Sequence, residues 1–307
     1  MAMLPQIVEV STPGRRIRLE RGFLKIADES GDLGALPVAD ISALITSTPA
    51  ISFTGQALAA LAEHGAPVVL CGANFSPSAY LLPASGHHAQ GFRVEAQAGA
   101  SLPMKKRIWA EIVKAKLTAQ ADALDRVGVP DERLRTMAAR MLSGDPLNRE
   151  AAGAQLYFPA LMGKGFTRNR DAEGVNAFLN YGYTVLRAAA ARAVIGAGLH
   201  PSFGVHHKSR GDGLRLADDL MEPFRPVVDL VARDLKAIGV MNLTPDAKRR
   251  LAAVLTFDYP TKAGISPLST VMVRLAISMA SVFMKERRKL DWPKSMLPAP
   301  AEPADAP

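Results

Sequence analysis

The chain has 307 residues, of which 48% are hydrophobic and 21% are charged. This composition is typical of a globular protein, and the length allows two domains or one large one. There are 37 Lys and Arg residues against 29 Asp and Glu, which gives a net charge of +8. Such an excess favours a polyanionic partner, nucleic acid before an anionic membrane. Many soluble proteins are mildly basic, so charge alone leaves the partner open.

The single cysteine, Cys71, excludes an internal disulfide framework. Its apolar neighbours in 66–73 predict a buried and inert thiol, which fits a reducing cytosol. The first residues lack a basic stretch followed by an apolar one, so we expect no signal peptide. No run of 18 apolar residues occurs, and no membrane span is expected. The sequence predicts a soluble, cytoplasmic protein.

The first third of the chain is predicted to be mostly β-structure. Alternating runs at 7–10 and 16–28 predict strands, and the STPGR between them is typical of a hairpin connection. A short helix is expected over 54–65, with Thr54 as its N-cap and Gly65 as its stop. Further β-rich runs lie at 41–47, 67–72 and 79–84, and 83–92 has the composition of a loop.

From Met104 the apolar residues recur at helical spacing. In the first helix, the face opposite the apolar one carries basic residues from Lys105 to Lys116. The helices are expected at 104–124, 131–142, 147–162, 174–198, 219–239, 244–257 and 266–290. The predicted fold is α+β, a small β-rich N-terminal domain followed by a larger all-α domain. The boundaries are 1–95 for the β-rich domain, 96–103 for a linker, 104–292 for the helical domain and 293–307 for a disordered tail.

One segment, 198–226, concentrates residues with metal-binding chemistry. Asp219 and Glu222 share a helix face, and His206 and His207 precede them. Such a set could hold Mg²⁺ or Mn²⁺, with neighbouring basic residues neutralising a phosphodiester. The alternative is that the acids favour a helix N-terminus and the histidines are solvated. Spacing alone favours that alternative, and the H-E-x-x-H pattern of zinc proteases is absent.

Other candidates are weaker. Glu150 lies in an alanine-rich helix, where it is either an ordinary exposed glutamate or a carboxylate that a ligand approaches closely. The basic stretch 163–171 is either an anion-binding patch or a solvated loop. His87 and His88 have no carboxylate near them in sequence and are interpreted as loop residues. No phosphate-binding loop, dinucleotide fingerprint or G-x-S-x-G elbow occurs.

Taken together, several of these stretches resemble the CRISPR-associated spacer-acquisition integrases, the catalytic subunits of the CRISPR adaptation complex. The resemblance runs over nearly the whole chain, and separated motifs in this order are specific where no single one would be. The stretches are ISALITSTPAISFTGQALAALAEHGAPVVLCGANFSP (41–77), IVKAKLTAQ (112–120), EAAGAQLYF (150–158), GVNAFLNYGYTVL (174–186), GLHPSFGVHH (198–207) and LADDLMEPFRPVVD (216–229).

The resemblance implies a β-rich domain before a helical one, and a Mg²⁺ or Mn²⁺ site. Glu150, His207 and Glu222 match the family's metal ligands, and Asp219 matches an acid that some members use in addition. Because GVHH doubles the histidine, His206 remains a minor alternative to His207. The doubled histidine and EPFRP look most like members from type II systems. The residues expected to contact DNA are Lys164, Arg168, Asn176, Lys208 and Arg210.

The family's reaction is the insertion of short DNA fragments (spacers) into a CRISPR array. The 3'-hydroxyl of the fragment attacks a phosphodiester of the repeat, and no nucleotide energy source is needed. The implied partners are double-stranded DNA, a second copy of the chain, and the second small CRISPR-associated protein, which together form a heterohexamer; type II effector and accessory proteins are further candidates. Two alternatives stay open: a metal-dependent nuclease acting on branched or single-stranded DNA, and a non-catalytic DNA-binding scaffold.

Overall fold

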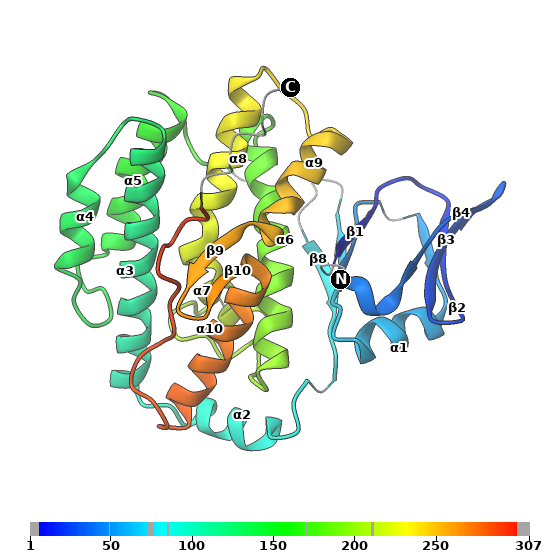
Figure 1. Cartoon of the computed structure of the whole chain (residues 1–307), viewed down its shortest axis with the longest axis horizontal. Helices are drawn as coiled ribbons and strands as arrows, with labels where there is room; N and C mark the ends of the chain where they lie inside the picture. The colour runs from blue at the N-terminus through cyan, green and yellow to red at the C-terminus, as the bar shows by residue number, and fades with distance from the viewer. Residues whose placement is uncertain are drawn as a thin grey trace.

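The structure is a computed structural model that describes residues 6–48, 50–72, 77–84, 86–169, 171–209 and 212–299. It places a strand-rich region beside a larger helical one (Figure 1). The strands are β1 (Gln6–Val10), β2 (Arg15–Glu20), β3 (Phe23–Asp28), β4 (Gly31–Pro37), β5 (Ile41–Thr46), β6 (Ile51–Phe53), β7 (Val68–Cys71), β8 (Pro77–Leu81), β9 (Asp258–Thr261) and β10 (Gly264–Pro267).

Most of the chain after β8 is helical. They are α1 (Gly55–Glu63), α2 (Gln90–Ala98), α3 (Leu102–Arg126), α4 (Glu132–Ala139), α5 (Arg149–Met162), α6 (Val175–Gly196), α7 (Arg215–Met221), α8 (Arg225–Ala237), α9 (Pro245–Ala252) and α10 (Leu268–Phe283). Short 3₁₀ turns are η1 (Val38–Asp40), η2 (Glu222–Phe224) and η3 (Ala253–Thr256). The predicted α+β class is confirmed.

The N-terminal region contains two four-stranded sheets, in the orders β1-β5-β7-β8 and β4-β3-β2-β6. The predicted hairpin between 7–10 and 16–28 is wrong, because β1 pairs with β5 and β2 with β3 and β6. The run 16–28 is itself the hairpin β2–β3. Its turn residues Arg21 and Gly22 have φ of 48° and 82°, and two positive φ values match the right-handed twist of paired strands.

Strand β5 joins the two regions, and every residue of it is buried. Ala43 and Ile45 belong to the large core shared with the helices, whereas Ile41 and Leu44 belong to a smaller core with α1 and the second sheet. A strand buried on both faces reads as a continuous apolar run, as this one does. Thr54 caps α1 by accepting from Ala57 N at 3.2 Å, as predicted.

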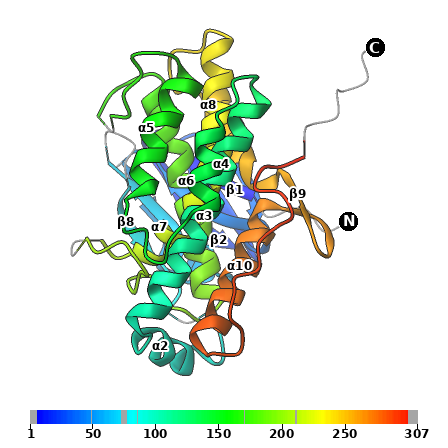
Figure 2. The same cartoon turned by 90° about the vertical axis from the view of Figure 1, so that its left-hand side faces the viewer.

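Helix α6 runs through the middle of the helical region and packs against α7, α8, α9, α10 and β5. A Cβ at Gly182 would overlap the Val228 side chain, so α6 and α8 approach as closely as glycine permits. Viewed from the side, α3, α4 and α5 form an outer layer in front of α6 (Figure 2). The candidate residues lie between this layer and α7.

Two helical predictions need correction. The predicted helix 219–239 is broken at η2, where Pro223 lacks the N–H that a continuous helix uses. The predicted all-α domain also contains the β9–β10 hairpin. Glu222 is the first residue of η2, so this candidate residue lies where the α-helix gives way to a 3₁₀ turn.

Parts of the predicted linker (96–103) are helical, and parts of the predicted tail (293–307) are buried in the core. Helix α2 ends at Ala98 and α3 begins at Leu102, so both extend into the predicted linker. Buried Gln97 donates to His200 O and Phe203 O, both at 2.9 Å. At the other end, Met296 and Leu297 are buried in the large core. The remainder of the predicted tail, 300–307, lies outside the described residues. Among the helices that the structure describes, none is long and apolar enough to cross a membrane.

Candidate active site

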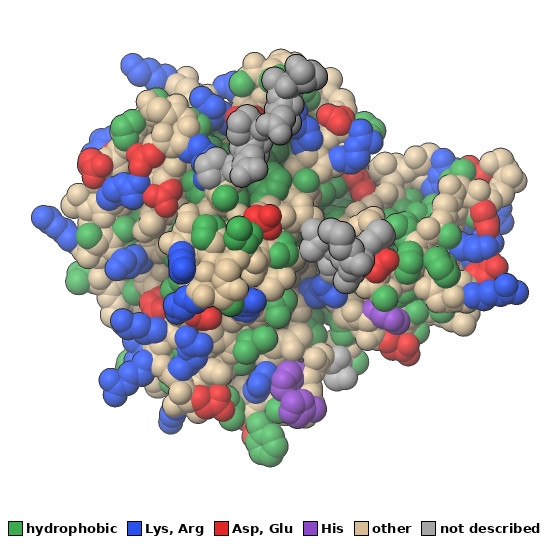
Figure 3. Space-filling view, viewed as in Figure 1, with side chains coloured by type: hydrophobic (Ala, Val, Ile, Leu, Met, Phe, Trp, Pro, Cys, Tyr) green, Lys and Arg blue, Asp and Glu red, His purple; other side chains and the backbone are tan. Residues whose placement is uncertain are grey.

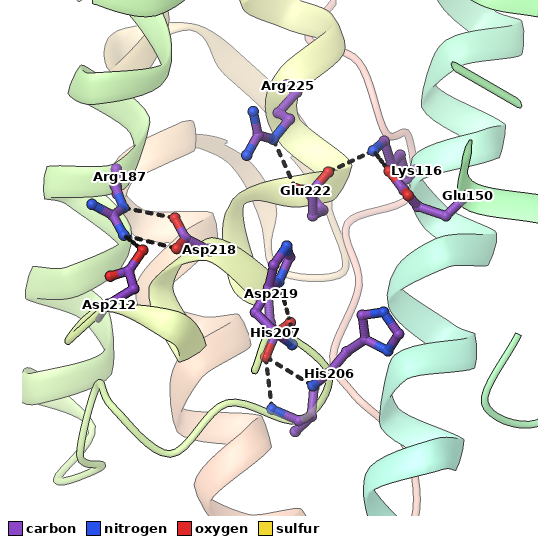
Figure 4. A network of polar contacts seen from close by, with 11 residues as sticks. Lys116, Glu150, Arg187, His206, His207, Asp212, Asp218, Asp219, Glu222 and Arg225 are labelled. Atoms are coloured by element: carbon purple, nitrogen blue, oxygen red, sulfur yellow. Dashed lines mark hydrogen bonds and ion pairs between the residues drawn. The ribbon is translucent and has the colours of Figure 1, made fainter. Parts of the chain in front are cut away.

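Two glutamates from distant parts of the chain meet at one lysine. Lys116 of α3 extends its ammonium between Glu150 of α5 and Glu222 of η2 (Figure 4). The Nζ–Oε2 distance to Glu222 is 2.6 Å, and Nζ also contacts Glu150 Oε1. The side chain of Lys116 is 8% exposed and that of Glu222 6%, whereas that of Glu150 is 30% exposed. The site is therefore buried on the Glu222 side and open to solvent at Glu150.

Glu150 is positioned by the first turn of α5. Asp145 caps the helix by accepting from Arg149 N at 2.8 Å and Glu150 N at 3.0 Å. These are N–H groups that a helix start leaves without intrahelical partners. Close to this turn, a Cβ at Gly153 would overlap Leu117 of α3. The close packing of α5 on α3 brings Glu150 to Lys116.

Glu222 is a buried anion held by two cations. Its Oε1 lies 2.9 Å from Nε of Arg225, and its Oε2 contacts Lys116. Burial alone would raise the pKa of this carboxyl, but Arg225 and Lys116 outweigh it and lower the pKa to about 2. Glu222 is therefore charged at neutral pH, which is the state that a metal ligand needs.

Lys116 was predicted on an exposed basic face, and this is wrong. Lys106, Arg107 and Lys114 are exposed on α3, but Lys116 is buried. Burial disfavours its charge, yet Glu222 and Glu150 outweigh that cost and raise its pKa. The sequence held a signal for this, because position 116 follows the apolar Trp109 and Ile112 by seven and four residues and so shares their face.

His207 is oriented by Asp219. The His207 Nδ1 lies 2.7 Å from Asp219 Oδ1, and Asp219 also accepts from the backbone N–H of Val205 at 2.6 Å and of His206 and His207 at 3.2 Å. Asp219 is fully buried. The hydrogen bond to Asp219 raises the pKa of His207, although burial opposes it. With Nδ1 engaged, Nε2 of His207 is the nitrogen left to bind a ligand.

His206 has a different environment. Its ring stacks on Trp109 of α3, with ring centroids 4.0 Å apart and planes 2° apart. Partial burial lowers its pKa, whereas that of His207 is raised. The adjacent histidines therefore point to different neighbours (Figure 4), and of the two it is His207 whose ring nitrogen lies against a carboxylate.

The candidate side chains meet some of the requirements of a divalent cation. Within the described part of the chain, no three His, Cys, Asp or Glu side chains are close enough together to hold a metal ion. The chemistry nevertheless fits, since two carboxylates already share one cation and an imidazole is held by a carboxylate through its other nitrogen. The contacts of Asp219 hold His207 and its backbone neighbours in place, and its role as an additional ligand stays a prediction.

The predicted DNA contacts fall into three groups. Lys164 and Lys208 are exposed. Arg168 donates to Asn176 Oδ1 at 3.1 Å and to Asn180 Oδ1 at 2.7 Å, and Asn176 is 7% exposed. Asn176 thereby anchors the loop before α6, and its direct contact with DNA stays a prediction. Arg210 lies outside the described residues. Lys and Arg side chains are spread over the helical region, with acidic side chains among them (Figure 3).

A second ionic cluster lies on the other side of α7. Arg187 of α6 donates from Nε to Asp218 Oδ1 at 2.7 Å and from Nη2 to Oδ2 at 2.8 Å, and Nη2 also contacts Asp212. Its Nη1 donates to the hydroxyl of Tyr80 at 2.8 Å. The sequence analysis did not predict this cluster. Arg225 and Trp109, which support the candidate site, were also missed.

Known proteins that are similar in sequence point to one family. The model of the family described as "CRISPR associated protein Cas1" matches residues 8–255. The chain is 37% identical over 286 residues to a CRISPR-associated endonuclease Cas1 of Neisseria meningitidis serogroup C, covering 92% of this chain and 93% of that protein. A Cas1 endonuclease of Pyrobaculum aerophilum is 30% identical, with 90% of this chain and 98% of that protein covered.

Solved structures agree on the fold. A casposase bound to an integration product superposes with a TM-score of 0.79 at 21% identity, covering 93% of this chain and 92% of that one. A Cas6-RT-Cas1–Cas2 complex gives a TM-score of 0.75 at 16% identity, covering 96% of this chain and 37% of that one. The family match over most of the chain and the identity to complete relatives lead to one conclusion: this chain belongs to the Cas1 family of CRISPR-associated proteins.

Proposed function

We propose that this protein is the integrase of a CRISPR adaptation complex, which joins short DNA fragments to a CRISPR array by transesterification. Family membership and the relatives named as endonucleases support DNA chemistry. The structural likeness to a casposase bound to an integration product supports strand joining over cleavage alone. One observation carries the proposal: Glu150 and Glu222, from separate segments, meet at Lys116, and the charge of Glu222 acts on His207, which Asp219 holds.

The proposed ligands of Mg²⁺ or Mn²⁺ are Glu150, His207 and Glu222. When bound, the cation supplies Lewis acidity that stabilises charge developing at phosphorus and on the attacking 3'-hydroxyl. Arg225 holds Glu222 in its ionised form, and Asp219 fixes which nitrogen of His207 faces the site. Lys164, Arg168 and Lys208 are proposed to bind backbone phosphates, which positions DNA without reading its sequence.

The proposed partners are double-stranded DNA, a second copy of this chain and a Cas2 protein. The likeness to the Cas1 part of a Cas6-RT-Cas1–Cas2 complex supports the Cas2 partner. The homodimer, its assembly with Cas2 into a heterohexamer, type II effector or accessory proteins, and action in the cytoplasm are proposed from the family resemblance.

A joining assay tests the function. The protein, its Cas2 partner, a short duplex with free 3' ends and a supercoiled array plasmid are combined with Mg²⁺ or Mn²⁺. We expect strand-joined product, and Glu222→Gln should lower its yield at least about 1000-fold, because a metal contributes several kcal/mol to such a transition state. Glu132→Gln, an exposed change on α4, serves as the control.

The outcomes separate the functions. Cleavage without joining would mean that the protein is a nuclease and not an integrase. Joining that survives Glu222→Gln would reject the site. Binding of DNA without any metal-dependent chemistry would indicate a scaffold. Affinity for the duplex, measured by fluorescence anisotropy, should stay within about twofold in Glu222→Gln and should fall steeply with salt.

A further inference from the structure

We propose that Lys116 is the built-in counter-ion of the metal-free site, and that a divalent cation binds by displacing its ammonium from Glu150 and Glu222. The inference rests on the proposed metal site. It assigns to Lys116 control over metal affinity and over the charge of the ion accepted.

Electrostatics explain why a cation is present in the metal-free protein. Glu222 is buried, and Glu150 approaches it from α5. Two carboxylates brought together repel each other, and in a poorly hydrated place the repulsion is strong. The ammonium of Lys116 between them offsets it, so the ligand pair is held together before any metal arrives.

The two cations of the site differ in how firmly they are held. Arg225 pairs with Glu222, and its guanidinium also lies over the ring of Tyr183, 4.4 Å from the centroid. Among the described residues, the polar contacts of the Lys116 ammonium are those with Glu150 and Glu222. An ammonium is a point charge on a flexible stem, whereas a guanidinium is a rigid fork. Lys116 is therefore the cation that can leave while Arg225 stays.

This arrangement favours divalent over monovalent ions. A sodium or potassium ion that replaced the ammonium would leave the charge between the carboxylates unchanged, and it would gain nothing for the displacement. A Mg²⁺ or Mn²⁺ ion doubles that charge, and the imidazole of His207 adds a ligand that an ammonium cannot use. Competition with Lys116 therefore selects Mg²⁺ or Mn²⁺ over Na⁺ or K⁺ at these carboxylates.

The test is calorimetric titration of the full-length protein with MnCl₂, comparing the unaltered chain with Lys116→Met and Lys116→Gln. Removal of the competing cation should lower the Kd for Mn²⁺ about tenfold or more. The matched control is Lys248→Met, since Lys248 is equally buried and lies 2.6 Å from Glu9, away from the site. The control should leave the Kd within about twofold of the unaltered protein.

An unchanged Kd in both Lys116 variants would overturn the inference. A higher Kd would also overturn it, because it would mean that Lys116 only positions the carboxylates. Failure of the unaltered protein to bind Mn²⁺ would instead reject the proposed metal site.

A second measurement needs no variant and covers the case in which both fail to fold. The unaltered protein is pulsed with acetic anhydride with and without Mn²⁺, and labelled lysines are quantified by mass spectrometry. Acetylation of Lys116 should rise at least about threefold with Mn²⁺, because the released ammonium loses its carboxylate partners, while Lys248 stays constant. Equal labelling of Lys116 in both conditions would contradict displacement.

Discussion

Two ionic clusters on opposite sides of α7 have the same pattern of charges but different roles. In each, one cation bridges two carboxylates: Lys116 between Glu150 and Glu222, and Arg187 between Asp212 and Asp218 (Figure 4). Arg187 engages both oxygens of Asp218, which fixes distance and angle together. Lys116 offers a point charge with no such geometry. The Arg187 cluster holds α6 and α7 in a fixed arrangement, whereas the Lys116 cluster is the proposed site of cation exchange.

The carboxyl groups differ in the same sense. Burial raises the pKa of Asp218 in spite of Arg187, whereas Arg225 and Lys116 outweigh burial at Glu222 and lower its pKa to about 2. Arg225 acts on both carboxyls, and Glu222 has the contact with Lys116 in addition. A surplus of positive charge around a buried carboxylate keeps it anionic, which suits a ligand that must be ready for a metal.

The largest effect is expected for Arg187→Met in the second cluster. The variant leaves Asp212 and Asp218 without their shared cation, and we expect a loss of about 2–4 kcal/mol in the free energy of unfolding. Urea denaturation measures it, and Arg187→Lys, which keeps the charge but loses the fork, should lose less. The Kd for Mn²⁺ should be unchanged; a large change there would make the two clusters one functional unit.

Asp219→Asn tests the support of His207. The amide keeps its size but loses the negative charge that holds Nδ1 of the imidazole, so the Kd for Mn²⁺ should rise about 10–100-fold. Asp218→Asn, one residue away but facing Arg187, is the matched control and should bind Mn²⁺ normally. Equal effects of the two changes would count against the assignment.

Asp229 offers a third environment for a buried carboxyl, without a lysine bridge. Tyr183 donates to it at 2.5 Å, but burial dominates and raises its pKa to about 6. Since the native state then holds its proton more tightly than the unfolded chain, stability is lost as pH rises from about 4 to 6. Asp229→Asn removes the titration.

Denaturation at both ends of this range checks the effect. We expect the difference in unfolding free energy between Asp229→Asn and the unaltered protein to shift by about 2 kcal/mol in favour of the variant between pH 4 and pH 8. Glu222 shows the opposite sign: its contribution is present above pH 4.5 and lost as pH falls towards 2. A difference that did not change with pH would disprove the account of Asp229.

The smallest effect is expected for His206→Ala. It removes the stacking on Trp109 and should cost about 1 kcal/mol of stability while changing the Kd for Mn²⁺ less than about twofold. His207→Ala should weaken Mn²⁺ binding at least about tenfold in the same titration. If the two variants exchanged these effects, the ligand would be His206.

Much of this fold follows from local patterns. Helix α1 begins after the predicted cap Thr54, and the apolar spacing of 104–124 lies within α3. The break at η2 was readable in principle, because Pro223 and Pro226 lie close together. Strand partners are a different matter, since β1 and β5 pair across more than thirty residues and a turn-like STPGR does not reveal that.

The site was harder to predict than the fold. Glu150, His207, Asp219 and Glu222 were proposed through the family resemblance, because spacing alone favoured an ordinary loop and helix start. Lys116 was placed on the wrong face, since a lysine in a buried stripe is unfavourable unless a partner compensates it. That partner comes from α5 and η2, and no local pattern carries the information that these segments meet.

The most direct test of the account is a crystal of the full-length protein soaked in MnCl₂, with anomalous diffraction recorded at the manganese absorption edge. We predict one strong anomalous peak between Glu150, His207 and Glu222, with the Lys116 ammonium withdrawn from both carboxylates. A peak elsewhere, or density in which Lys116 still bridges Glu150 and Glu222 at saturating Mn²⁺, would contradict it.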